Sequence, residues 1–261
     1  MIASDETHWW YRGRRRVLRA ELDRLPELSG QRRLLDAGCG SGRTLDELAD
    51  YGATTGIDLS GLAIAATAKR GHEVVLAPIE DMPFEAGSFD AVTCLDVLEH
   101  TPDDRASLRE LRRITRPGGT LLITVPAFPS LWSQHDVLNQ HYRRYTRPAL
   151  RAAAIDAGWK VERDTFFNSL LLAPAAVTRL LQRFRPAGGS SDLSRTPAIL
   201  NDLLEHVLGV EARAIRAGLR LPFGLSLMAV MTNPEPQPRR RRSDLVASAP
   251  AEPALPQLKV A

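Results

Sequence analysis

A short glycine-rich stretch in the first fifth of the chain has the composition of a ligand-binding turn. Its glycines, Gly38, Gly40 and Gly42, follow an apolar run that ends at Asp36. Glycine lets the backbone come close to a bound molecule, and in α/β proteins such turns follow the first strand of the sheet. Asp58 lies 22 residues after Asp36, where a carboxylate can accept both hydroxyls of a ribose. The two features together predict a site for an adenosine-bearing molecule.

The glycine spacing separates this turn from the one that binds dinucleotides. A dinucleotide-binding turn has its third glycine one position later, and Arg43 stands there instead. The carboxylate of Asp36 also disfavours a pyrophosphate at this point, whereas it suits a cationic or amino-bearing ligand. An adenosine that carries an amino acid therefore fits both carboxylates better than a dinucleotide does.

The elements that must position this turn alternate between strand and helix patterns. Apolar runs typical of strands cover 33–36, 54–58, 73–77, 89–95, 119–125, 159–167 and 223–231. Helical spacing of apolar residues covers 5–25, 44–51, 62–70, 103–113, 146–157, 170–184 and 199–217. Such alternation implies right-handed crossovers. We predict an α/β fold with a mainly parallel seven-stranded sheet, helices on both faces and a helical insertion before the last strand.

The chain is predicted to form one domain with appendages. With 261 residues and 44% hydrophobic residues, it can bury one substantial α/β core. The expected domain is 1–232, in which 1–28 is an N-terminal lid helix and 168–220 is the helical insertion. From residue 233 the composition changes to proline, alanine and charge, with arginine at each position of 239–242. We expect 233–261 to be disordered and its arginines to be solvated.

Composition also excludes several classes of partner and location. The net charge of +3 is a small difference between 34 basic and 31 acidic side chains, so no overall field selects nucleic acid. No apolar run is long enough to span a membrane, and the N-terminus does not resemble a secretory signal. The helix at 170–184 is compatible with peripheral membrane contact, but packing against 199–217 explains it better. We expect a cytoplasmic protein with reduced thiols at Cys39 and Cys94.

Three further motifs follow the glycine turn in order. They are Glu80-Asp-Met-Pro-Phe84, the segment from Phe89-Asp90 to Asp96-Val-Leu-Glu-His100, and Arg116-Pro-Gly-Gly119. Together with the turn, these motifs resemble the class I S-adenosylmethionine-dependent methyltransferases, particularly the methyltransferase type 11 branch that includes ubiquinone-biosynthesis-like enzymes. The resemblance covers roughly residues 30–160. It implies a Rossmann-like fold, S-adenosylmethionine as the cofactor and methyl transfer as the reaction.

The resemblance assigns cofactor-binding roles along the motifs. By this resemblance Asp58 and Leu59 contact the ribose, and Ile79, Glu80 and Asp81 lie at the adenine. The remaining cofactor-binding residues are those of the glycine turn, Asp36, Gly38, Gly40 and Gly42, and those at the end of the fourth strand, Leu95 and Asp96. Many relatives have an acid at the position of Pro78, and that acid binds the adenine amino group. Candidates for this contact here are the Ile79 backbone amide, for a ring nitrogen, and the carboxylate of Glu80 or Asp81.

Three histidines are candidates for the base that methyl transfer to a hydroxyl needs. His100 follows the fourth strand, and His135 and His141 lie in 126–147, a long segment without clear periodicity. An enzyme must align the acceptor and, for a neutral hydroxyl, take up its proton. The aromatic and arginine side chains of 126–147 suit a sugar, phenol or carboxylate; the alternative is a surface loop whose arginines pair with helix carboxylates. We predict transfer to oxygen of a small-molecule or glycan acceptor.

Other interpretations of the same residues stay open. Asp96, Glu99 and His100 resemble an acid-x-x-Glu-His pattern that binds a divalent ion in some relatives, but Asp96 replaces the usual glutamate, and we expect no metal. For Glu99 and His100 the favoured interpretation is structural: they end the strand and cap the next helix. At the level of function, the alternative is a non-catalytic adenosyl-nucleotide-binding subunit that serves interaction. An NAD-linked oxidoreductase is disfavoured by the glycine spacing and Asp36.

Overall fold

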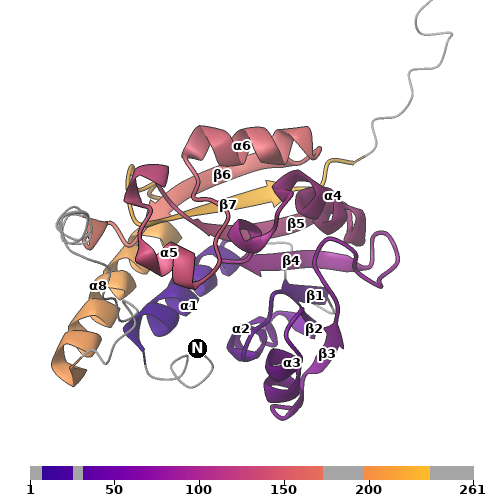
Figure 1. Ribbon diagram of the computed structural model, residues 1–261, viewed down its shortest axis with the longest axis horizontal. Helices are drawn as coiled ribbons and strands as arrows, with labels where there is room; N and C mark the ends of the chain where they lie inside the picture. Colours follow the sequence, from indigo (N-terminus) through magenta and orange to yellow (C-terminus); the bar gives the residue numbers. More distant parts are fainter. Residues whose placement is uncertain (1–7, 26–31, 173–196, 236–261) are drawn as a thin grey trace, which may run out of the picture.

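A computed structural model of the protein describes residues 8–25, 32–172 and 197–235 (Figure 1). Its sheet has seven strands in the order β3-β2-β1-β4-β5-β7-β6. Their bounds are β1 (Arg32–Ala37), β2 (Gly52–Asp58), β3 (Glu73–Leu76), β4 (Phe89–Leu95), β5 (Thr115–Pro126), β6 (Lys160–Phe167) and β7 (Ser226–Thr232). Strand β7 is antiparallel to β5 and β6, and the other neighbouring pairs are parallel. The predicted mainly parallel, seven-stranded sheet is confirmed.

The helices cover both faces of this sheet. Their bounds are α1 (Trp9–Leu22), α2 (Arg43–Leu48), α3 (Gly61–Ala68), α4 (Asp104–Ile114), α5 (Gln134–Leu138), α6 (Arg147–Asp156) and α8 (Ala198–Arg216). Figure 1 shows α4 and α6 on one side of the sheet and α1, α2 and α8 on the other. Thr146 caps α6, because its side chain accepts a hydrogen bond from the Ala149 amide.

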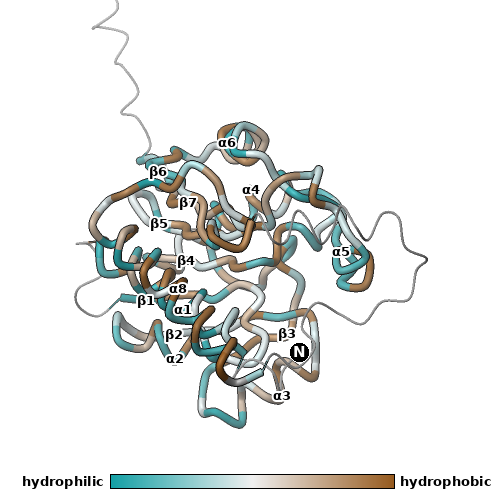
Figure 2. The backbone as a smooth tube through the Cα atoms, turned by 90° about the vertical axis from the view of Figure 1, so that its left-hand side faces the viewer, coloured by the Kyte–Doolittle hydropathy of each residue, from teal (hydrophilic) through white to brown (hydrophobic). Residues whose placement is uncertain are grey.

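Each face of the sheet has its own hydrophobic core. Leucines and alanines of α4 and α6 pack on one face with Leu121 and Ile123 of β5. On the other face Val17 and Leu18 of α1 pack with Leu208 of α8. Figure 2 shows hydrophobic and hydrophilic stretches alternating along α1 and α8, as expected for helices with one buried side. The sheet is therefore covered on both faces, and its strand ends are left for a site.

Helix α8 packs directly alongside α1, as Figure 1 shows. The two helices run in the same direction, because the Trp9 amide donates to the Asn201 side chain at one end and the Arg24 side chain donates to the Ile215 carbonyl at the other. Gly13 permits this approach: a Cβ at that position would overlap the side chain of Leu208. The absence of a side chain at Gly13 thus sets the distance between α1 and α8.

Replacing Gly13 by valine should destabilise the protein, because the branched side chain must push α8 away. We expect the free energy of unfolding to fall by about 1–3 kcal/mol, the usual cost of overpacking a core. Urea denaturation followed by circular dichroism measures the change. Gly61→Val is the matched control, since a Cβ at Gly61 meets nothing within 4 Å; equal stability of the two variants would contradict the proposed role of Gly13.

Two predicted segments lie partly or wholly outside the described residues. The helix at 170–184, with Arg179 and Arg183, is described only to residue 172, and the tail only to residue 235. Asn233, the first residue of the expected tail, is buried, and its side chain donates to the backbone carbonyls of Arg112 and Thr115 at 3.2 and 2.7 Å. Among the described helices, none is long and apolar enough to cross a membrane.

Candidate active site

The glycine turn between β1 and α2 adopts a conformation that needs its glycines. Gly38, Gly40 and Gly42 have φ values of 84°, 55° and 80°, which side chains disfavour. A Cβ at Gly38 would overlap Val97, and one at Gly42 would lie 2.7 Å from Thr67. Beside Gly40, by contrast, nothing lies within 4 Å of an added Cβ. The turn is therefore packed at its ends and open at its middle, where a ligand can approach the backbone.

Asp58 links this turn to the start of α3. One carboxylate oxygen accepts a hydrogen bond from the Gly40 amide at 2.9 Å, and the other accepts one from the Ser60 amide at 2.8 Å. Ser60 in turn caps α3, because its side chain accepts a hydrogen bond from the Ala63 amide. Because each carboxylate oxygen has two lone pairs, both can accept a further hydrogen bond. The backbone thus holds the Asp58 carboxylate in one orientation beside the open part of the turn.

Asp36 has a different environment from Asp58. Its side chain is buried, and one of its oxygens accepts a hydrogen bond of 2.6 Å from the Thr93 hydroxyl of β4. The carboxylate thus lies beneath the turn, between neighbouring strands β1 and β4. A negative charge in that position acts on a ligand above the turn through the field that it creates.

The predicted adenine-binding residues differ in exposure. Leu59, directly after Asp58, is 74% exposed, so an apolar surface lies open beside the carboxylate. The side chain of Ile79 instead packs in the core beneath α4 and α6. Glu80 and Asp81 point into solvent. Of the predicted set, Leu59 offers a free side-chain surface, Ile79 can contribute its backbone alone, and the two carboxylates stay accessible.

At the end of β4, Asp96 is held by three groups. Its amide donates to the Thr124 carbonyl at 2.9 Å, and its side chain accepts from the Thr124 hydroxyl at 3.1 Å. The Arg14 guanidinium donates to the other carboxylate oxygen at 2.7 Å and reaches the Leu95 carbonyl at 3.4 Å. Arg14 belongs to α1, and it stacks over the Tyr11 ring of the same helix at 5.6 Å. Helix α1 therefore closes over the end of β4 through an ion pair.

Arg14 was not among the residues predicted for the site. The N-terminal segment has arginine at positions 12, 14, 15 and 16, and no feature of the pattern distinguishes one from the next. The aromatic residues before Arg14 lie in two different environments. Trp10 stacks on Phe167 in the core, with ring centres 5.8 Å apart, whereas Tyr11 lies beside Arg14.

The ends of β4, β5 and β6 share an unusual backbone feature. Asp96, Phe128 and Asn168 follow these strands, and each has a positive φ between 56° and 60°. This conformation costs free energy for a residue other than glycine, and it is concentrated at functional sites. The strained residues thus mark the carboxyl edge of the sheet, the same edge as the glycine turn.

The segment predicted to be aperiodic, 126–147, contains the short helix α5. Asp136 of this helix is completely buried. Its carboxylate accepts a hydrogen bond from the Arg144 guanidinium at 2.7 Å and lies 2.9 Å from Nδ1 of His141. Although burial acts to raise the pKa of Asp136, hydrogen bonds from His141 and Arg144 hold it well below the ordinary value. An ionised carboxylate only accepts, so Nδ1 of His141 carries the proton.

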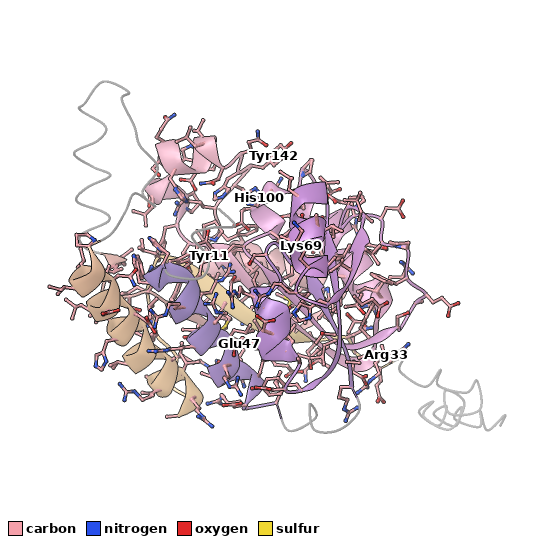
Figure 3. The ribbon with its side chains drawn as sticks, turned by 90° about the horizontal axis from the view of Figure 1, so that it is seen from below. Tyr11, Arg33, Glu47, Lys69, His100 and Tyr142 are labelled. Carbon is pink, nitrogen blue, oxygen red and sulfur yellow. The ribbon has the colours of Figure 1, made fainter. Side chains whose placement is uncertain are left out.

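His141 also meets two side chains from a distant segment, Glu99 and His100. His100 and His141 lie with ring centres 4.7 Å apart, and potential ligand atoms of Glu99, His100 and His141 lie within 4.8 Å of one another. The Tyr142 amide donates to the Glu99 carbonyl at 2.7 Å and joins the two segments. Figure 3 shows His100 and Tyr142 in the same part of the molecule. The sequence could not indicate this meeting, because His100 and His141 are 41 positions apart.

Glu99 is the buried member of this group. Burial raises the pKa of Glu99 well above its ordinary value, and the negative charge of Asp96 raises it further. Partial desolvation and the nearby His141 ring lower the pKa of His100. Of the pattern expected from relatives, Glu99 and His100 fall within the group and Asp96 does not, since Asp96 pairs with Arg14. The three donors are of types that bind divalent transition ions.

His135 lies at the edge of the same region. Its Nε2 is 3.1 Å from the Asn139 side chain, and its ring centre is 6.2 Å from that of His141. Two arginines of the segment pair with carboxylates: Arg143 with Asp104 at 3.2 Å and Arg144 with Asp136. The alternative of arginines paired to helix carboxylates is therefore observed at these positions. One of these ion pairs also holds the carboxylate of Asp136, which contacts His141.

The middle of the chain matches a known domain family. Residues 35–123 match the family model of a methyltransferase domain. The chain is 34% identical over 147 residues to a ubiquinone biosynthesis O-methyltransferase of Xanthomonas oryzae pv. oryzae, a match that covers 49% of this chain and 61% of that protein. It is 37% identical over 109 residues to the protein of the same name from Bordetella avium, covering 38% and 45%. The chain thus spans less than two thirds of these curated relatives.

Solved structures show the same fold at low identity. A chain of the complex between the Haloferax volcanii Trm112 methyltransferase activator and a methyltransferase aligns with a TM-score of 0.60 and 19% identity, covering 91% of this chain and 94% of that one. Geranyl diphosphate methyltransferase in complex with S-adenosylmethionine aligns with a TM-score of 0.56 and 18% identity, covering 82% and 85%. Both likenesses concern the fold, and the predicted Rossmann-like architecture agrees with them.

Proposed function

Because the chain carries a class I methyltransferase domain, we propose that it binds S-adenosylmethionine and transfers the methyl group to a hydroxyl oxygen of a small-molecule or glycan acceptor. The observation that carries this proposal is the open Gly40 backbone beside an Asp58 carboxylate that the Gly40 and Ser60 amides orient. The names of the curated relatives favour oxygen as the methylated atom.

In this proposal the cofactor lies across the carboxyl edge of the sheet. Asp58 accepts the ribose hydroxyls, and the exposed Leu59 side chain covers one face of the adenine. The backbone amide of Ile79 donates to a ring nitrogen of the adenine, and the carboxylate of Glu80 or Asp81 accepts from its amino group. The amino acid part of the cofactor extends over Gly38, Gly40 and Gly42 toward Leu95 and Asp96, above the buried charge of Asp36.

His141 is the base that the geometry favours. Since Asp136 holds the protonated Nδ1, the neutral ring has its lone pair on Nε2. In the reaction the acceptor oxygen forms a bond to the methyl carbon as the carbon–sulfur bond breaks. The hydroxyl proton passes to Nε2 of His141 and then to water. His100, whose ring packs on that of His141, is the second candidate, and His135 is a more distant third.

Calorimetry on the purified protein tests the cofactor assignment. We expect saturable binding of S-adenosylmethionine and S-adenosylhomocysteine and no binding of oxidised NAD. Binding of NAD alone would replace the proposal with a dehydrogenase, and binding of neither ligand would overturn it. Repeating the titrations after treatment with a chelator examines the other use of Glu99, His100 and His141, because a lost or altered signal would mean that they hold a metal ion.

Transfer of a radiolabelled methyl group tests catalysis itself. A panel of phenols, sugars and carboxylates is offered with labelled S-adenosylmethionine, and the labelled product is analysed for the methylated atom. We expect a phenol or sugar hydroxyl to be labelled. Cofactor binding without transfer to any member of a broad panel would favour the non-catalytic interaction subunit.

A further inference from the structure

A pocket lies between α1 and α8. Its volume is about 380 Å³, and its charged and polar lining consists of Arg16, Arg19, Asp23, His206, Arg213 and Arg216. Figure 3 shows Glu47, the ion-pair partner of Arg19, well separated from His100 and Tyr142. None of the lining residues belongs to the glycine turn or to the group of Glu99, His100 and His141, so the pocket needs an explanation other than the methyl-transfer site.

Small residues on the facing sides of the two helices leave room for this pocket. Ala20 of α1 and Gly209 and Ala212 of α8 line it between the charged side chains. The alanines are buried, so the pocket reaches down to the contact between the helices. A volume of 380 Å³ lies within the range of pockets that hold small ligands.

Guanidinium groups dominate the lining. Four of them line the pocket together with a single carboxylate, that of Asp23. Acidic side chains hold three of the arginines in place: Glu205 lies 2.5 Å from Arg16, Asp50 and Glu47 lie 2.5 and 2.9 Å from Arg19, and Asp23 lies 3.1 Å from Arg216. A guanidinium has five N–H donors, so each of these arginines can bind a ligand as well. The carboxylates orient the donors without using all of them.

Arg213 is the least engaged of the four arginines. In the described part of the chain no carboxylate forms an ion pair with it, and its side chain is exposed at the pocket. Arg213 and Arg216 also lie in the last turn of α8, where cations stabilise a helix through its dipole. That effect does not explain why Arg16 and Arg19 of another helix face the same cavity.

We propose that this pocket binds the phosphate group of an anionic ligand. Arginine forks match the geometry of phosphate oxygens. Arg213 brings a positive charge that no carboxylate of the described residues pairs with, and the other three arginines bring N–H donors that their carboxylates leave unused. The phosphate can belong to a soluble diphosphate or to a lipid headgroup. Helix α8 also exposes Leu203 and Val210, which would contact acyl chains in the second case. The site is separate from methyl transfer and does not depend on that proposal.

Calorimetry with inorganic pyrophosphate tests the pocket in the full chain. We expect saturable binding that Arg213→Glu weakens at least tenfold and Arg213→Gln weakens to a smaller extent. Arg109→Glu is the matched control, because Arg109 is exposed on α4, outside the pocket, and the change in charge is the same. Saturating S-adenosylhomocysteine should leave pyrophosphate binding unchanged, which separates this pocket from the candidate active site.

Flotation with phosphatidylglycerol vesicles distinguishes the sources of the phosphate. Binding of vesicles but not of pyrophosphate, lost in Arg213→Glu and kept in Arg109→Glu, would assign the pocket to a lipid headgroup. Binding of pyrophosphate with the same dependence would assign it to a soluble ligand. The proposal is overturned if neither probe binds, or if the two glutamate variants lose binding equally. Circular dichroism confirms that each variant is folded.

Discussion

Replacing Asp58 by alanine is expected to weaken the binding of S-adenosylmethionine by at least about 100-fold. The ribose hydroxyls would lose two hydrogen bonds to a charged acceptor, and such bonds contribute about 1.5–3 kcal/mol each. The change also removes the acceptor of the Gly40 and Ser60 amides, so the turn itself becomes less ordered. Calorimetry with S-adenosylhomocysteine measures the loss.

Two further variants make the Asp58 result interpretable. Asp58→Asn keeps one oxygen acceptor and nearly the same shape, so it should bind more tightly than the alanine variant and less tightly than the wild type. Asp46→Ala removes a carboxylate that pairs with Arg70 and His72 instead, and its cofactor affinity should not change. Unaltered affinity in a folded Asp58→Ala protein would show that the ribose binds elsewhere.

Replacing His141 by alanine should lower the turnover number by about 10²–10⁴-fold, the usual contribution of a general base. Cofactor affinity should stay within about twofold of the wild type. In our proposal His141 lies on the acceptor side, so the substitution removes a proton acceptor and no contact with the cofactor. The measurement is kcat with the best acceptor from the radiolabel panel, together with the dissociation constant of S-adenosylhomocysteine.

A glutamine variant separates catalysis from packing at this position. The side-chain amide of His141→Gln can still donate to Asp136, but it cannot take up a proton. It should therefore be as slow as the alanine variant while retaining thermal stability. His72→Ala serves as the control, since His72 pairs with Asp46 on another part of the surface. Full turnover in both His141 variants would exclude this residue as the base, and His100 would then be the next candidate to test.

The meeting of the glycine turn and Asp58, on which the proposed cofactor site rests, could be predicted because these residues lie close together in the sequence. Gly38, Gly40 and Gly42 form one turn, and Asp58 ends the neighbouring strand, so local spacing sets their relative positions once β1 and β2 pair. The alternation of strand and helix patterns likewise led to the mainly parallel sheet. The spacing of apolar residues can be read from the sequence alone, so the helices and strands could be predicted without knowing how they pack.

The acceptor half depends on contacts between segments far apart in the chain. Each of the three histidines was a candidate in the sequence, and only folding distinguishes His141, by placing Asp136 at its Nδ1 and His100 against its ring. The Arg14–Asp96 pair joins positions 82 residues apart. Such pairs follow from the way α1 and α5 pack over the strand ends, and no local pattern records that.

The amino-acid sequence by itself determined the architecture of this protein and the place of its glycine turn beside Asp58. The reason is that backbone preferences and hydrophobic spacing act over a few neighbouring residues. Tertiary structure alone decided which histidine is oriented by a carboxylate, which N-terminal arginine reaches Asp96, and how four arginines of α1 and α8 come to face one pocket. These arrangements rest on electrostatic and packing interactions between side chains that only the folded chain brings within a few ångströms of each other.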